Sequence, residues 1–113
     1  MKNLKLIVNN ENKIKDNFFN KVELQLILNL YAKMVSGGEW KDYGLTISKI
    51  EISFNVYHRA SEFPVYKITK NLKPKYKNEK YIIKNSKSEI IKRSENLESL
   101  INKIVWKKLK LVN

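Results

Sequence analysis

The sequence contains no cysteine, and its 113 residues include one histidine, two prolines and three glycines. Without cysteine the chain forms neither a disulfide nor a thiolate zinc site, and one imidazole leaves few ligands for any metal. A serine triad would have to be built on that single histidine, and no glycine-rich phosphate loop of the Walker or dinucleotide type occurs. These absences predict a protein without a metal, a cofactor or enzymatic activity.

Long apolar runs are missing as well. No stretch approaches the roughly 20 apolar residues that span a membrane, and the apolar run at 4–8 is too short for a secretory signal. We therefore expect a cytoplasmic protein with no membrane contact. A chain of this length fits one domain, which buries roughly two-thirds of its unfolded surface. The pattern predicts a loosely ordered arm over 1–19 and a single domain over 20–113.

Acidic residues are scarce relative to basic ones. The chain has 23 Lys and Arg but 11 Asp and Glu, which gives a net charge of +12. Residues 59–93 hold 11 basic and 3 acidic side chains, so this segment alone contributes +8. Such a segment attracts nucleic acid, another polyanion or an acidic protein. Codon bias is the competing explanation, because Lys, Asn and Ile, all with A/T-rich codons, make up 48 residues.

The best-defined element is a helix that begins after Asn20. Asn20 and Glu23 have the spacing of a capping box, and Phe19 and Leu24 that of a hydrophobic staple. Apolar residues then recur at helical spacing until two glycines at 37 and 38 end the run. They form one row of Leu24, Ile27, Leu28, Tyr31, Met34 and Val35, and a second row of Val22, Leu26 and Leu30. Two rows require burial on more than one side, either within the domain or in a homodimer.

Period-two alternation follows the glycines and predicts strands near 43–48, 50–58 and 65–70, then a basic loop over 71–79 and a hairpin of 81–84 with 89–92. Ser94 or Asn96 can cap a closing helix with the stripe Leu97, Leu100, Ile101 and Ile104, ending on the lysines at 107, 108 and 110. This order predicts an α+β domain: a helix, an antiparallel sheet of four or five strands and a helix, with both helices on one face of the sheet.

Two polar stretches flank the first pair of strands. Because these strands should be antiparallel, position 43 lies near position 57, and the stretches meet at one corner. The corner comprises Trp40, Asp42, Tyr43, Arg59, Ser61, Glu62 and Tyr66. It either stabilises the end of the core or forms a pocket in which Trp40 is a platform and Arg59 anchors an anion. A hydrolase built on His58 would need a second acid that this segment lacks.

Two further features are candidate partner sites. The outward face of the second and third strands, continued by the basic loop, gives a polyanion surface of Tyr57, Arg59, Lys67, Lys70, Lys73, Lys75 and Lys77. Trp106, about 180° from Leu97 on an extended closing helix, is expected to be an exposed anchor for a partner or a cover for the arm.

The two polar stretches also carry a family resemblance. Gly38-Glu39-Trp40-x-Asp42-Tyr43, Arg59-Ala60-Ser61-Glu62-x-Pro64-x-Tyr66 and Lys107-Lys108-Leu109-x-Leu111-Val112 resemble a family of short alphaproteobacterial proteins known only as a domain of unknown function. The resemblance covers residues 18–112 and implies a bacterial cytoplasmic protein, without implying an activity. We predict a non-enzymatic basic binding protein for nucleic acid or another polyanion. The alternative is a protein-interaction or regulatory subunit that uses the first helix or Trp106.

Overall fold

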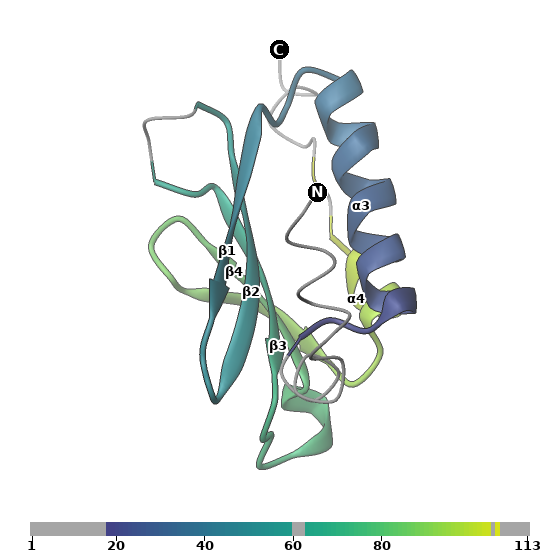
Figure 1. Ribbon diagram of the computed structural model, residues 1–113, viewed down its shortest axis with the longest axis vertical. Helices are drawn as coiled ribbons and strands as arrows, with labels where there is room; N and C mark the ends of the chain where they lie inside the picture. The colour runs from purple at the N-terminus through teal and green to yellow at the C-terminus, as the bar shows by residue number, and fades with distance from the viewer. Residues whose placement is uncertain (1–17, 60–62, 105, 107–113) are drawn as a thin grey trace, which may run out of the picture.

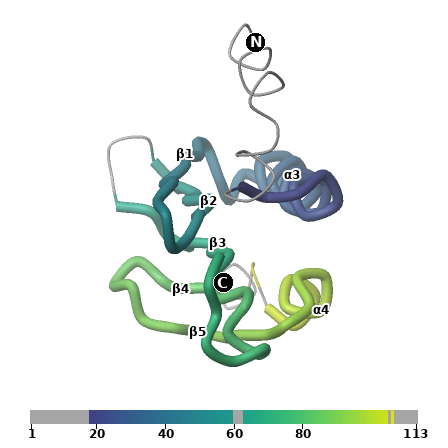
Figure 2. The backbone as a smooth tube through the Cα atoms, turned by 60° about the horizontal axis from the view of Figure 1, so that its bottom comes forward, coloured from purple at the N-terminus to yellow at the C-terminus, as the bar shows by residue number. Residues whose placement is uncertain are grey.

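The computed structural model describes residues 18–59, 63–104 and 106. Helix α3 (Lys21–Ser36) precedes five strands and the short helix α4 (Leu97–Asn102). The strands are β1 (Asp42–Ile47), β2 (Glu51–Tyr57), β3 (Tyr66–Asn71), β4 (Tyr81–Asn85) and β5 (Ile90–Ser94), with a 3-10 turn, η1 (Lys77–Glu79), between β3 and β4. They form one antiparallel sheet in the order β1-β2-β3-β4-β5, and both helices lie on the same side of it (Figure 1, Figure 2). The predicted α+β fold is confirmed, with five strands.

Helix α3 begins as its sequence predicts. The side chain of Asn20 accepts the backbone N–H of Glu23 at 2.8 Å, and the Glu23 carboxylate accepts the N–H of Asn20 at 2.7 Å. The helix ends at Ser36 with Gly37 as its C-cap, followed by Gly38 in the left-handed region at φ 78°, where a side chain would be strained. Phe19, the last residue assigned to the arm, is buried in the core.

The buried stripe of α3 combines the two rows. Ile27, Leu30 and Met34 are buried, together with Glu23 on the same stripe. Leu30 belongs to the second row and Leu26 is partly buried against the core, so these two residues of the second row contribute to the same core as the first row. Only Val22, near the start of the helix, remains widely exposed from that row.

The inner face of the sheet supplies the rest of the core. Phe54, Ile68 and Ile83 lie side by side on β2, β3 and β4, and all three are fully buried. Burying a side chain of this size stabilises the fold by about 1.5–3 kcal/mol, so this row anchors the helices to the sheet. Among the described residues, no helix has the length and hydrophobicity to cross a membrane.

Helix α4 is shorter than the sequence pattern predicts. Asn96 caps it by accepting the N–H of Ser99 at 2.8 Å, and the helix ends at Asn102. Leu97, Leu100 and Ile101 are buried as expected. The lysines at 107, 108 and 110, expected at the helix end, lie outside the described residues.

Trp106 is not the exposed residue that a longer helix would have made it. Because the chain leaves the helical path after Asn102, Trp106 does not lie on the helix side opposite Leu97. The indole N–H of Trp106 donates to the carbonyl of Ile101 at 3.1 Å. Its ring meets Trp40 and Tyr66 edge-on, at centroid distances of 5.5 and 4.9 Å. Trp106 therefore covers one end of the core, which leaves much less of it for a partner.

Candidate functional site

The sheet presents one face that neither described helix covers, here called the open face (Figure 2). Strand pairing arranges its residues in two rows across all five strands. One row is Gly44, Asn55, Lys67, Lys84 and Ile90, and the other is Thr46, Ser53, Thr69, Ile82 and Arg93. Tyr57 belongs to the same face, because a Cβ placed on Gly44 would lie 3.8 Å from the Tyr57 ring.

The centre of the open face is a network of neutral polar side chains. The Ser53 hydroxyl donates to the Asn55 side-chain oxygen at 2.8 Å and lies 3.1 Å from the Thr69 hydroxyl oxygen. The Asn55 amide nitrogen donates to the Thr46 hydroxyl at 3.0 Å. Ser53, Asn55 and Thr69 are buried. Since buried polar groups are costly unless paired, these bonds stabilise polar rather than apolar side chains at the centre of this face.

Two lysines stand beside this network. Lys67 and Lys84 are direct partners across β3 and β4, so two basic side chains extend from adjacent positions of the open face. Lys67 donates to the Ser88 hydroxyl at 3.1 Å, and no described residue forms an ion pair with either lysine. Like charges directly opposite each other destabilise a sheet. The pair is therefore unfavourable for folding and suited to an anion.

The predicted polyanion surface divides into three parts. Tyr57 and Lys67 lie on the open face as expected, and Arg59 follows the end of β2. Three further lysines, Lys73, Lys75 and Lys77, lie in the β3–β4 connection. This connection follows the end of β3 that is farther from Arg59. Lys70 turns to the helix side instead, where its side chain is 12% exposed. Lys84 and Arg93, which the surface omitted, belong to the open face.

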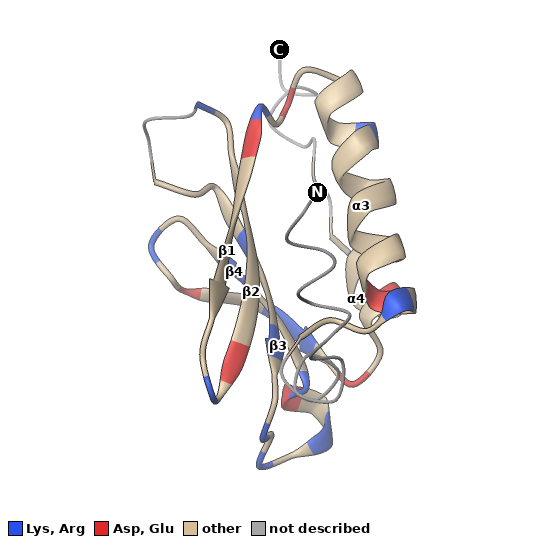
Figure 3. Ribbon diagram, in the orientation of Figure 1, with Lys and Arg blue, Asp and Glu red and all other residues tan. Residues whose placement is uncertain are grey.

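Figure 3 shows how the charge is distributed over the molecule. Basic residues gather in the β3–β4 connection at the bottom of the view and along β4 and β5. Strands β1 and β2 carry no Lys or Arg at all. The basic segment thus covers one half of the sheet and its tip rather than the whole surface.

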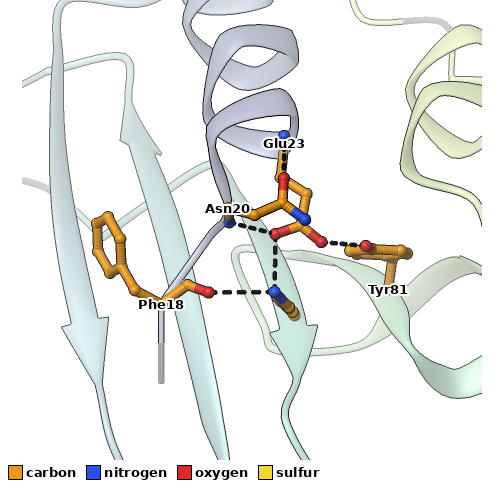
Figure 4. A network of polar contacts seen from close by, with 5 residues as sticks. Phe18, Asn20, Glu23 and Tyr81 are labelled. Carbon is orange, nitrogen blue, oxygen red and sulfur yellow. Dashed lines mark hydrogen bonds and ion pairs between the residues drawn. The ribbon is translucent and has the colours of Figure 1, made fainter. Parts of the chain in front are cut away.

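Lys70 is part of a buried ionic network that joins α3 to the sheet (Figure 4). Its ammonium group donates to the Glu23 carboxylate at 2.8 Å and to the carbonyl of Phe18 at 3.1 Å. The Tyr81 hydroxyl donates to the other carboxylate oxygen of Glu23. With the capping bond from Asn20, Glu23 accepts hydrogen bonds from three parts of the chain.

The network shifts two pKa values in opposite directions. Burial alone would raise the pKa of Glu23, but the hydrogen bonds from Lys70, Tyr81 and the Asn20 N–H outweigh it and lower that pKa. Burial, followed by the hydrogen bond to Glu23 and its negative charge, raises the pKa of Tyr81. Glu23 is therefore held ionised and Tyr81 protonated, which is a structural arrangement rather than a reactive one.

The predicted polar corner has its aromatic residues on the helix side. Trp40 is only 2% exposed and packs against Tyr31, Tyr66 and Trp106. Tyr43 stacks on Phe54 at a centroid distance of 4.8 Å. Burial, with the nearby charge of Glu39, raises the pKa of Tyr66. The geometry favours the corner-stabilising interpretation, since a buried Trp40 offers no platform to a ligand.

The described polar groups at this corner form short-range hydrogen bonds. The Asp42 carboxylate accepts the N–H of Tyr43 at 2.8 Å, and Nδ1 of His58 lies 2.8 Å from the carbonyl oxygen of Glu39. The described register pairs Asp42 with Tyr57, so the expected approach of the two stretches is confirmed. Ser61 and Glu62 lie outside the described residues.

The sequence predictions missed the buried ion pair of Glu23 and Lys70, although the sequence contains signals for both residues. Glu23 is a charged residue on the apolar stripe of its helix, which indicates a buried partner. Lys70 follows Tyr66 and Ile68 at period two, so the alternation already placed it inward. The polar network of the open face was also missed, although Ser53, Asn55 and Thr69 occupy alternate positions of strands that flank the core.

Comparison with known proteins gives a family but no activity. A family model described as a protein of unknown function (DUF2794) matches residues 17–101, which include both polar stretches. The predicted resemblance to a domain of unknown function is confirmed, although its last motif, at 107–112, lies outside the match. Neither the curated proteins nor the solved structures contain a significant match to the chain.

Proposed function

The chain belongs to this family of proteins of unknown function, and we propose that it is a non-enzymatic protein that binds nucleic acid through the open face of its sheet. The phosphate backbone is the part recognised, and the contact is led by Lys67 and Lys84. Arg93 and the lysines of the β3–β4 connection extend the positive field from this pair toward the end of the sheet where β3 ends.

The observation that carries this proposal is the cross-strand pair of Lys67 and Lys84. Their repulsion opposes folding, and no described carboxylate relieves it. An anionic ligand that lies between the two ammonium groups converts this repulsion into attraction. Phosphates of a nucleic acid supply such charges at regular intervals, and lysine binds them as a point charge.

The remainder of the open face supports a contact that reads little sequence. Ser53, Asn55 and Thr69 use their polar atoms on one another, so few are left to read base edges. Tyr57 is the one aromatic residue of this face among the described residues, and it is half-buried. Stacking is therefore limited, and affinity should come mainly from charge.

Oligonucleotide binding tests the proposal directly. The full chain is titrated into fluorescently labelled mixed-sequence oligonucleotides, single-stranded and duplex, over a series of salt concentrations. The logarithm of the affinity should fall linearly with the logarithm of salt, by about 0.7–0.9 per phosphate contacted. Absence of binding at low ionic strength, or binding independent of salt, would overturn the proposal.

Matched charge reversals locate the contact. Lys67→Glu and Lys84→Glu should each weaken binding and reduce the salt dependence. Lys33→Glu changes the net charge equally but lies on α3, on the other side of the sheet, and should leave binding nearly unchanged. Equal losses from all three variants would show a non-specific effect of net charge. If the chain bound an acidic polypeptide but not the oligonucleotides, and if Lys67→Glu and Lys84→Glu weakened that binding, the partner would be an acidic protein instead.

A further inference from the structure

The two edges of the sheet differ in how they are protected against pairing with another strand. The edge strand β5 carries Lys92 and Arg93, and the register between β4 and β5 shifts at Ile83 and Lys84. Charges and bulges of this kind prevent edge-to-edge association. The edge strand β1 has a regular register, no proline and one charged residue, Asp42, at its first position. Its outer edge is unprotected, and no described strand pairs with it.

Apolar side chains line the unprotected edge. Tyr43, Leu45 and Ile47 face the helix side of the sheet, yet Leu45 is 43% and Ile47 59% exposed. On α3, Leu28 and Val35 are about as exposed as Leu45 and lie seven residues apart, on one flank of the helix.

This flank of α3 faces β1. Tyr31 lies on the same side of the helix, and its ring meets the rings of Tyr43 and Phe54 at 5.2 and 5.8 Å. The contact of Tyr31 with Tyr43 therefore joins this flank of α3 to β1. Leu28 and Val35 of α3 with Tyr43, Leu45 and Ile47 of β1 are here called the β1 surface.

The backbone of β1 is oriented for pairing. Ser48 donates its N–H to Glu51 on β2, and since direction alternates along a strand, Tyr43, Leu45 and Ile47 turn theirs outward. Consistent with this, the outward N–H of Tyr43 is bound by the Asp42 carboxylate. The residues whose backbone N–H groups point outward are thus the same residues that carry the exposed apolar side chains, and pairing at Tyr43 would replace the bond to Asp42.

We propose that the β1 surface binds a second copy of this chain, by antiparallel pairing of β1 with β1 of the partner about a two-fold axis at Leu45. An identical strand is self-complementary in this arrangement, because Leu45 meets Leu45 of the partner subunit and Tyr43 meets Ile47 of the partner subunit. The exposed leucine and valine of the two α3 helices then approach each other over the joined sheet.

The main basic cluster does not oppose a second copy at β1, despite the net charge of +12. The cluster of basic residues on β4, β5 and the β3–β4 connection lies away from β1, and Lys41 and Lys49 flank that strand. Antiparallel pairing sets Asp42 of one copy opposite Ser48 of the partner subunit and next to the partner's Lys49, which attracts it. Lys41 lies opposite that same lysine, so each end of the contact holds one attractive and one repulsive pair of charges. The two open faces remain on the same side of the ten-stranded sheet, which doubles any surface they provide for a ligand. The dimer itself does not depend on the proposed function.

Sedimentation of the full chain tests the dimer. The wild-type protein is expected to sediment as a dimer at micromolar concentration. Leu45→Lys places a charge at the two-fold axis and should give a monomer. Ile90→Lys is the matched control, since Ile90 is 45% exposed on the protected edge strand β5, and it should remain dimeric. Both positions are exposed, so both variants should keep the circular dichroism spectrum of the wild type.

A single-cysteine experiment tests the register, since the chain has no cysteine of its own. Directly opposite residues of an antiparallel pair have Cα atoms about 4.5–5.5 Å apart, within the range that a disulfide spans. Leu45→Cys should therefore give a disulfide-linked dimer on mild oxidation, whereas Ile90→Cys should not. A wild-type monomer, or a dimer that Leu45→Lys leaves intact, overturns the proposal. If the wild type is a monomer and its β1 amide protons are still protected from hydrogen exchange, the strand that pairs with β1 would be residues 4–8 of the same chain.

Discussion

Lys67 on β3 lies directly opposite Lys84 on β4, on the face of the sheet that neither described helix covers. A pair of like charges at this position opposes the pairing of two central strands. Asn55, the neighbour of Lys67 on β2, is neutral and bonded to other side chains. A carboxylate in place of either lysine would therefore stabilise the sheet, yet both positions carry a positive charge.

This relationship predicts that folding and binding respond oppositely to one substitution. Lys84→Glu replaces a repulsion with an attraction and should raise the free energy of unfolding by about 1 kcal/mol, as measured by urea denaturation. The same variant should bind oligonucleotides more weakly than wild type.

Lys84→Gln provides the intermediate case, because it removes one charge without adding the opposite one. Its stability should lie between those of wild type and Lys84→Glu. If the three proteins were equally stable, the two ammonium groups would not repel each other appreciably, and their pairing would not indicate an anion site.

The buried ion pair of Glu23 and Lys70 should show strong energetic coupling. Glu23→Gln and Lys70→Met each leave a charge or polar group without its partner at a poorly exposed site, and each should cost about 3 kcal/mol in urea unfolding. The double variant should cost clearly less than the sum of the two.

The exposed pair of Glu79 and Arg93, 3.5 Å apart, serves as the comparison. Arg93→Met should cost less than about 1 kcal/mol, because solvent screens this pair. Additive effects of Glu23→Gln and Lys70→Met would contradict the network shown in Figure 4.

The lowered pKa of Glu23 predicts a loss of stability in acid. A carboxyl group whose pKa is lower in the folded state stabilises the fold above its unfolded pKa, and this contribution disappears as the pH falls through the folded value. The free energy of unfolding should therefore decrease more steeply below about pH 5 in wild type than in Glu23→Gln. Parallel pH profiles for the two proteins would show that Glu23 has an ordinary pKa in the folded state.

Trp106 should act through packing rather than recognition. Trp106→Ala removes contacts with Trp40 and Tyr66 and should destabilise the protein by about 2 kcal/mol, since the side chain is half-buried. Tyr76→Ala, at an exposed position, should cost much less. Oligonucleotide affinity should be unchanged in Trp106→Ala at a temperature where the variant is folded. Unchanged stability with lost binding would instead make Trp106 a contact residue.

Much of the fold could be predicted because its signals are local. The capping box of Asn20 and Glu23, the glycines after Ser36 and the alternation in β2 depend on neighbouring residues alone. The candidate site was less predictable. Period two correctly put Lys67 outward and also put Lys70 inward, yet charge composition suggested a single basic surface for both. Lys84 could not be chosen without the register that sets it against Lys67.

The sequence by itself determined the α+β class, the limits of α3, the faces of the central strands and the family, since periodicity, caps and motifs are written along the chain. Only the tertiary structure decided which residues meet across it. Lys70 finds Glu23 47 positions away, Trp106 turns back onto Trp40, and β1 is left as an unprotected edge. These outcomes depend on strand order and on where α4 ends, and both are set by the packing of the whole core rather than by any local pattern.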